Sequence, residues 1–423
     1  MGSSREIKGA ALLDVATYDT AEIAAVDRYS NRIVQAFYPE MFQTLGYPMR
    51  VKHTDQLWRY IDVMHETRTH HNIEFLLQGM TAEEFELYKR VVKTVDEHAK
   101  ANFKMRAHPT AALLRAIHVL RLIKIVTGEA RPAVLEVGPG CGYLAMLLVM
   151  EGYPYIGTEV VQAFYLYQSH MLSHVATNLR ELAADDGDIL TVEQPKPGTA
   201  VHIPWWKWIT LTPQKINLSA GIMTSNHVMC EMQPSSMAYM AVAGRQMLSR
   251  HPGGGKFVFE NWGYDLLHSP KVVADKFAEH GLVVCHDEYA MSAMVLSEEI
   301  DRWLGRQRGE EGSTAKPGAD AGNWRAIRRR VGAALDTVPP LKRLAVVTYG
   351  QLLKFRMQGP ASVVKGPDGA HPLSKQLTEG KAAVIAEATI HEPQIQAFLM
   401  SYFGGTVPQL PDEAFFALIG TRQ

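Results

Sequence analysis

This chain of 423 residues has few cysteines and almost no excess of one sign of charge over the other. Its three cysteines, Cys141, Cys230 and Cys285, are too few and too far apart for a disulfide framework or a zinc-ligand pattern, which indicates a reducing compartment. The 43 basic and 44 acidic residues leave a net charge of -1, so the chain as a whole has no electrostatic footprint for nucleic acid or an anionic membrane. A small-molecule substrate is therefore favoured.

Long apolar segments are missing as well. No run reaches the roughly 18 apolar residues of a membrane span, and residues 1–9 lack the apolar region of a secretory signal. The hydrophobic fraction of 47% and the charged fraction of 21% are typical of globular proteins. The sequence thus predicts a soluble cytoplasmic protein with no nucleic-acid or membrane partner, and leaves open whether it forms a homodimer.

What the chain does have is a glycine-rich turn between an apolar strand and an apolar helix, within residues 134–150. Glu136 stands before the turn, and Gly138, Gly140 and Gly142 alternate through it. Glycines at this spacing let the backbone pass close to a ligand with no Cβ in the way. The pattern therefore predicts a cofactor-binding turn, with a purely structural turn as the simpler alternative.

The next strand supports the cofactor interpretation. Residues 153–158 are rich in β-forming side chains, and Glu159 follows them, 17 residues after Gly142. A carboxylate at the end of the second strand can accept both hydroxyls of a ribose, in dinucleotide sites as well as in other adenosine sites. A dinucleotide fingerprint would need glycine or alanine three residues after Gly140, where Tyr143 stands, and this disfavours a dehydrogenase.

The series Glu-x-Gly-x-Gly-x-Gly from Glu136 to Gly142 resembles the first motif of class I S-adenosylmethionine-dependent methyltransferases. The resemblance implies that the turn wraps the methionine end of S-adenosyl-L-methionine and that Glu136 organises the site around its ammonium group. It covers about residues 131–296 and the C-terminal strand. The overall layout is also loosely similar to putative sugar O-methyltransferases and other small-molecule biosynthetic methyltransferases.

The expected fold is α/β, a doubly wound, seven-stranded Rossmann-like methyltransferase sheet with a helical N-terminal domain and a helical insertion before the last strand. Short apolar runs alternate with helical patterns, which is typical of a parallel sheet. Six strands are expected at or near 134–137, 153–158, 200–203 (or 205–211), 216–224, 256–260 and 282–286. Helices are expected over 55–78, 82–104, 110–127, 235–250 and 271–280.

The seventh, antiparallel strand is assigned to residues 414–419, Ala-Phe-Phe-Ala-Leu-Ile, beside the sixth. The predicted division is therefore a helical domain or lid at 1–130, a cofactor-binding α/β domain at 131–296, a helical or irregular cap at 297–410 and the last strand within 411–423. The alternative is an independent helical C-terminal domain that ends in an unrelated strand.

Candidate catalytic and substrate residues follow two strands. His227 and Glu231 come after the fourth strand, four residues apart, and His227 is proposed as a base or as a group that orients the acceptor. Asn226 is expected to contact the cofactor, whereas Glu260 and Asn261, after the fifth strand, are expected to contact the substrate. Ordinary capping of strand ends and loops is the alternative for each.

Histidines are concentrated in residues 64–74, but their spacing matches no zinc motif, so no metal is expected. His70 is kept as a candidate substrate contact. The family often has an acid near the end of the third strand that holds the adenine amino group. None can be assigned here, although Asp185, Asp186 and Asp188 are nearby.

The activity implied by the resemblance is methyl transfer to oxygen or nitrogen of a small molecule, by in-line displacement at the sulfonium methyl. Two alternatives share the same cofactor turn. One is another reaction of S-adenosylmethionine, such as aminocarboxypropyl transfer or cyclisation; the other is a non-catalytic cofactor-binding module. The sequence does not identify the acceptor.

Overall fold

The structure is a computed structural model. It describes residues 12–27, 50–62, 76–109, 111–185, 192–211, 217–229, 232–260, 269–288, 291–308, 361–366 and 368–410. Within them, no helix is both long enough and apolar enough to cross a membrane.

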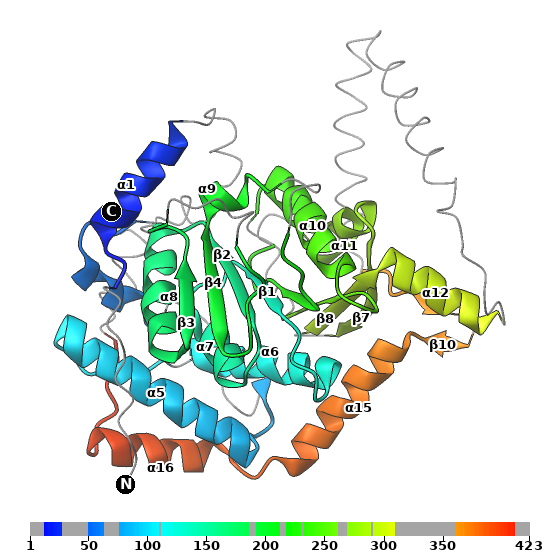
Figure 1. The fold of residues 1–423 in the computed structure, drawn as a ribbon. Helices are drawn as coiled ribbons and strands as arrows, with labels where there is room; N and C mark the ends of the chain where they lie inside the picture. The colour runs from blue at the N-terminus through cyan, green and yellow to red at the C-terminus, as the bar shows by residue number, and fades with distance from the viewer. Residues whose placement is uncertain are drawn as a thin grey trace, which may run out of the picture.

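The centre of the molecule is a mixed sheet in which eight strands are described, in the order β3-β4-β2-β1-β5-β6-β8-β7 (Figure 1). The strands are β1 (Val134–Val137), β2 (Tyr155–Glu159), β3 (Asn178–Glu181), β4 (Thr199–Pro204), β5 (Ile222–Thr224), β6 (Lys256–Phe259), β7 (Leu282–Glu288) and β8 (Met291–Leu296). The first six strands in this spatial order, from β3 at the edge to β6, each pair in parallel with their neighbours. Strand β8 is antiparallel to both β6 and β7. The sequence predicts a largely parallel α/β sheet that ends in an antiparallel strand, and this prediction is confirmed.

Helices cover both faces of the sheet (Figure 1). The helices and the one 3-10 helix are α1 (Val15–Val26), η1 (Thr54–Tyr60), α5 (Ala82–Phe103), α6 (Ala111–Thr127), α7 (Tyr143–Met150), α8 (Gln162–Val175), α9 (Trp205–Trp208), α10 (Pro234–Ser249), α11 (Pro270–Glu279), α12 (Ser297–Gln307), α15 (Pro372–Glu387) and α16 (Glu392–Phe403). A short hairpin of β9 (Lys365–Gly366) and β10 (Gly369–Ala370) precedes α15. Local signals explain several boundaries: Thr81 and Glu84 form the capping box that begins α5, as the sequence predicts.

The core has two halves, one on each face of the sheet. Side chains alternate along β1, so Val134 joins the cluster under α5 to α8, whereas Leu135 and Val137 join the cluster under α10 and α11. Apolar residues of α1, α15 and α16 belong to the first of these clusters. The N-terminal and C-terminal helices described therefore share one continuous core with the sheet.

Six of the expected strands are present, as β1, β2, β4, β5, β6 and β7. The third is 199–204, and the alternative of a strand at 205–211 is wrong because α9 begins at Trp205. Strand β3 was not expected, since Asn-Leu-Arg-Glu at a half-exposed sheet edge has no apolar pattern.

The antiparallel place beside the sixth strand is filled by β8, not by residues 414–419, which lie outside the described residues. All six residues of β8 are buried, so its sequence, Met-Ser-Ala-Met-Val-Leu, has no alternation of polar and apolar side chains to mark it as a strand. As a consequence, α12, α15 and α16 come after the last described strand of the sheet. The division into domains remains a prediction.

Candidate functional site

The glycine turn joins the end of β1 to the start of α7. Gly138, Gly140 and Gly142 all have positive φ, at 71°, 57° and 76°, a region that other residues enter only with strain. A Cβ on Gly138 would lie 2.5 Å from Cγ2 of Val228, and one on Gly142 would lie 2.8 Å from Cγ of Gln168. A Cβ on Gly140 would meet no atom of the described residues within 4 Å. The outer glycines thus permit close packing, and the middle one faces open space.

Glu159 reaches from the end of β2 to this turn. Its carboxylate accepts hydrogen bonds from the backbone N–H of Gly140 (3.2 Å), Val160 (2.8 Å) and Val161 (3.0 Å). Burial raises the pKa of Glu159, and although these three donors act in the opposite direction, the pKa is raised to about 7. Two residues that the sequence assigns to one cofactor site are therefore adjacent in the structure.

Glu136 is the second buried carboxylate near the turn. The hydroxyl of Tyr155 donates to its Oε2 (2.8 Å), and the side-chain amide of Gln168 donates to that hydroxyl (2.8 Å). Burial raises the pKa of Glu136 to about 8, with the hydrogen bond from Tyr155 opposing the shift and the charge of Glu159 adding to it. No basic side chain among the described residues pairs with either acid, so the site suits a cationic ligand that also donates hydrogen bonds.

Asn226 connects the ends of β5 and β6. Its Nδ2 donates to Oγ1 of Thr224 (3.0 Å), and its Oδ1 accepts from the backbone N–H of Glu260 (2.7 Å). The neighbouring Ser225 donates through Oγ to the carbonyl oxygen of Val137 at the end of β1 (2.9 Å). These bonds hold three strand ends together beside the glycine turn. Contact of Asn226 with a cofactor remains a prediction.

His227 and Glu260, predicted from two separate strand ends, are in direct contact. Nε2 of His227 lies against Oε2 of Glu260 and also against Nη1 of Arg115. His227 has a φ of 58°, and a residue other than glycine in this region usually marks a strained position that the surrounding structure holds in place. The contact brings a titratable ring to the edge of the sheet where this fold binds its ligands.

Two residues of this cluster come from α6 and were not found from the sequence. Arg115 and His118 are both buried, with Nη1 of Arg115 3.5 Å from Oε2 of Glu260 and Nδ1 of His118 3.5 Å from Oε1 of Glu260. Burial alone would raise the pKa of Glu260, but His227, His118 and Arg115 outweigh it and hold that pKa well below its usual range. The available signal was a row of basic residues three apart, Arg115, His118, Arg121 and Lys124, in a helix whose other residues are nearly all apolar.

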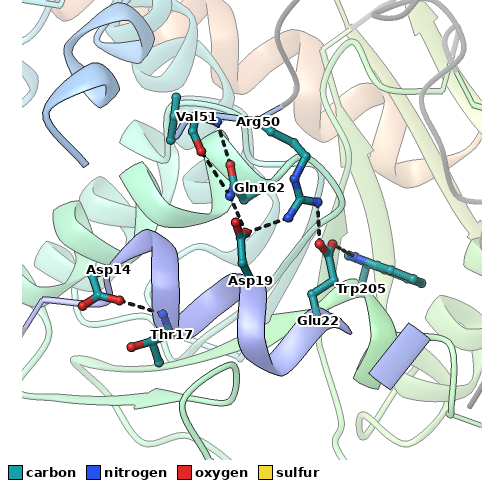
Figure 2. Close-up of polar contacts among 8 residues, drawn as sticks. All are labelled: Asp14, Thr17, Asp19, Glu22, Arg50, Val51, Gln162 and Trp205. Atoms are coloured by element: carbon teal, nitrogen blue, oxygen red, sulfur yellow. Dashed lines mark hydrogen bonds and ion pairs between the residues drawn. The ribbon is translucent and has the colours of Figure 1, made fainter. Parts of the chain in front are cut away.

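Helix α1 and residues 50–51 form what we call the N-terminal cap, and Figure 2 shows its polar contacts with Gln162 and Trp205. Arg50 pairs with Asp19 (2.6 Å) and with Glu22. Gln162, at the start of α8, donates to Asp19 (2.6 Å), and Trp205, directly after β4, donates through Nε1 to Glu22 (2.7 Å). The cap is thus anchored to the first residues of α8 and α9, the helices that follow β2 and β4.

Several predicted residues cannot be placed. Glu231, Asn261 and His70 lie outside the described residues, as do Asp186 and Asp188. Asp185 is described and pairs with Arg180. The carboxylate that contacts Trp205, the first residue after β4, is instead Glu22 of the N-terminal cap.

Neither a family model nor a curated protein sequence matches this chain. Among solved structures, it is similar to the pyocyanin biosynthetic protein PhzM (11% identity, 51% of this chain and 70% of that one, TM-score 0.30). It is also similar to the glycopeptide N-methyltransferase MtfA complexed with S-adenosyl-L-homocysteine (11%, 42% and 86%, TM-score 0.29) and to an S-adenosylmethionine-dependent methyltransferase from Aquifex aeolicus (12%, 48% and 95%, TM-score 0.29). Likeness at this level carries no information about the acceptor, so the functional argument depends on the geometry of the site.

Proposed function

We propose that this protein transfers a methyl group from S-adenosyl-L-methionine to a small-molecule acceptor. The observation that carries the proposal is the open position at Gly140, which lies against the buried carboxylate of Glu159. An adenosine with a positively charged amino-acid tail supplies what this site lacks, namely hydroxyl donors for Glu159 and a cation for Glu136. The residues present therefore fit the cofactor.

Each residue would hold a different part of the cofactor. Glu159 would accept hydrogen bonds from the ribose hydroxyls, and Glu136 would become ionised beside the ammonium group because a neighbouring cation favours the charged carboxylate. The N-terminal cap would close the side of the site next to Trp205. When bound, the cofactor supplies an electrophilic methyl group on sulfonium, which an acceptor attacks in line.

The cluster around Glu260 would hold the acceptor. Where the acceptor carries a proton, His227 would take it through Nδ1, the ring nitrogen that does not face Glu260, and Glu260 would stabilise the imidazolium. Glu231 and Asn261 adjoin this cluster in the sequence and stay proposals for the catalytic and substrate-binding roles, as does His70. Burial of the cluster favours a small acceptor over a macromolecule.

Calorimetry with S-adenosyl-L-homocysteine tests the cofactor site, and the mass of the product tests the reaction. We expect binding with one site per chain, followed by transfer of a labelled methyl group into low-molecular-weight compounds of a metabolite extract. A gain of one methyl group distinguishes methyl transfer from aminocarboxypropyl transfer or cyclisation. An intact, folded protein that gives no heat with either form of the cofactor rules out the proposal.

A further inference from the structure

The cluster around Glu260 has more hydrogen-bond donors than acceptors. Building on the proposed function, we propose that its acceptor presents an oxyanion, a carboxylate or a phenolate, to Arg115 and His118, so that the enzyme methylates an acidic oxygen. The cluster lies beside the glycine turn, it holds buried nitrogens that have no hydrogen bond among the described residues, and two contacts of His227 conflict.

The cluster adjoins the glycine turn. Val228, the residue after His227, is the side chain that a Cβ on Gly138 would strike, so the loop after β5 is packed directly on the turn. Strands β1, β5 and β6 are neighbours and parallel, which places their carboxyl ends at one edge of the sheet. A group bound between Arg115 and His227 would therefore lie beside the cofactor site.

One carboxylate faces three nitrogen-bearing side chains in this cluster. Arg115 and His118 are only 6% and 2% exposed, yet Nε of Arg115 and Nδ1 of His118 have no hydrogen bond within the described part of the chain. Oε1 of Glu260 is 3.5 Å from that imidazole nitrogen, a long contact. A buried donor without an acceptor has lost its hydrogen bonds to water with nothing in return, which is unfavourable. Nε of Arg115, which has no hydrogen bond among the described residues, and the long contact of His118, both fixed by α6, indicate that a ligand supplies the missing hydrogen-bond acceptor.

The contacts of His227 cannot both be hydrogen bonds at one time. Its Nε2 touches the Glu260 carboxylate, to which it must donate, and the Arg115 guanidinium, from which it must accept. Because Glu260 is ionised in this surrounding, Nε2 carries the hydrogen and donates to Glu260. Arg115 is then left with a long contact of 3.5 Å to Glu260 and has donor capacity that this contact does not use.

The hydrogen-bond donors Arg115 and His118 favour some classes of methyl acceptor over others. A cationic amine would face the fixed positive charge of Arg115, and Glu260, the carboxylate that the described residues place there, is already engaged, so an amine nucleophile is disfavoured. A neutral alcohol or amide can accept one hydrogen bond from these donors. An oxyanion forms charge-assisted hydrogen bonds with a guanidinium, and these are roughly twice as strong as neutral ones. A carboxylate or phenolate also needs no further deprotonation before it attacks.

The preference for an oxyanion can be tested by saturation-transfer NMR, with the protein fully occupied by S-adenosyl-L-homocysteine. Four probes of similar size are compared: benzoate, 4-nitrophenolate, benzamide and benzylamine. We expect signal from one or both anions, at least tenfold weaker signal from benzamide, and none from benzylamine. Signal from benzoate alone identifies a carboxylate site, and signal from 4-nitrophenolate alone identifies a phenolate site. Equal signals from all four probes, strong benzylamine binding, or no signal from either anion overturns the proposal.

The matching variants are Arg115→Met and Arg180→Met. Both remove one arginine charge, but Arg180 is half exposed at the sheet edge, where it pairs with Asp185. Anion binding should fall at least tenfold in Arg115→Met and remain unchanged in Arg180→Met, while Arg115→Lys should retain part of it. Calorimetry with S-adenosyl-L-homocysteine on the same samples separates the two proposals. If the unmodified protein binds S-adenosyl-L-homocysteine but no anion, only the proposed class of methyl acceptor is refuted. If the unmodified protein does not bind S-adenosyl-L-homocysteine, the proposed function itself is refuted.

Discussion

The carboxylate of Glu159 accepts a hydrogen bond from the backbone N–H of Gly140, over 3.2 Å. This bond joins the end of one strand to the middle of the turn that follows another, and both groups border the open position at Gly140. A ligand bound there would meet the carboxylate and the turn together. The relationship makes the cofactor site testable by substitutions at either end of the bond.

Gly140→Ala should weaken cofactor binding at least tenfold without unfolding the protein. Gly128 provides the matched control, because it has the same φ of 57° and its Cβ would also meet no described atom within 4 Å, but it lies at the end of α6, away from the turn. Each alanine should cost about 1 kcal/mol of stability through its left-handed backbone. Calorimetry should show S-adenosyl-L-homocysteine affinity reduced at least tenfold in Gly140→Ala only. Equal affinity in the two variants would place the ligand elsewhere.

Cofactor affinity should rise between pH 6 and pH 8. The pKa of Glu159 is raised to about 7, so the carboxylate that accepts hydroxyl donors becomes fully ionised only above that pH. In Glu159→Gln the rise over this range should be reduced and the affinity at pH 8 should fall about tenfold or more. Glu83→Gln, at an exposed side chain of α5, is the reference. A pH profile that is the same in both variants would argue against contact of Glu159 with the ligand.

How much of this site the sequence predicts depends on whether the signal is local. The turn at Gly138 to Gly142 and the acid at Glu159 were predictable because each role is set by its immediate neighbours: positive φ at the glycines and the end of a short strand at Glu159. The sequence placed His227 and Glu260 at the ends of two strands, but it did not predict that they are in contact. The contact forms because β5 and β6 are adjacent, and strand order is a property of the whole sheet.

Arg115 and His118 could not be predicted for the same reason. The partner of a polar residue in a largely apolar helix is decided by the elements that the helix packs against. In α6, Arg121 lies three residues after His118, yet it pairs with Glu84 and not with the cluster around Glu260. Strand β8 was missed because full burial removes the alternation that identifies a strand. In each case the deciding interaction is tertiary.

Glu136→Gln should stabilise the protein without ligand at high pH while weakening the cofactor site. The pKa of Glu136 is raised from 4.5 to about 8 in the fold, so the native state holds a proton that the unfolded chain has released. Stability from this group is therefore present at low pH, declines as pH rises from 4.5 to about 8, and stays reduced above that. At pH 9, urea unfolding should show Glu136→Gln more stable by on the order of 2 kcal/mol.

The same variant should bind S-adenosyl-L-methionine more weakly, because it has no carboxylate to face the ammonium group. Stability and binding would then change in opposite directions, which a purely structural role of Glu136 does not produce. If Glu136→Gln instead lost stability at pH 9 and kept its affinity for the cofactor, Glu136 would be a structural residue held by Tyr155.

Acid should destabilise the protein through histidines packed between α5 and α8. Nδ1 of His98 lies 2.9 Å from Nε2 of His174, and the ring of His170 is 5.4 Å away, centroid to centroid. Burial lowers the pKa of His98 to about 3, and the two neighbouring rings lower it further in the same direction. The unfolded chain takes up a proton at this position below about pH 6.5, whereas the native state does not.

The stability contributed by neutral His98 is consequently complete above pH 6.5 and is lost as the pH falls towards 3. Its loss should steepen the decline of the unfolding free energy by about 1.4 kcal/mol per pH unit between pH 5.5 and pH 4. In His98→Gln, chemical unfolding over this range should show a slope smaller by about that amount, with the value at pH 8 serving as the reference for each variant. An unchanged slope would mean that His98 takes up a proton in the native state, and that the contact with His174 opens before the protein unfolds.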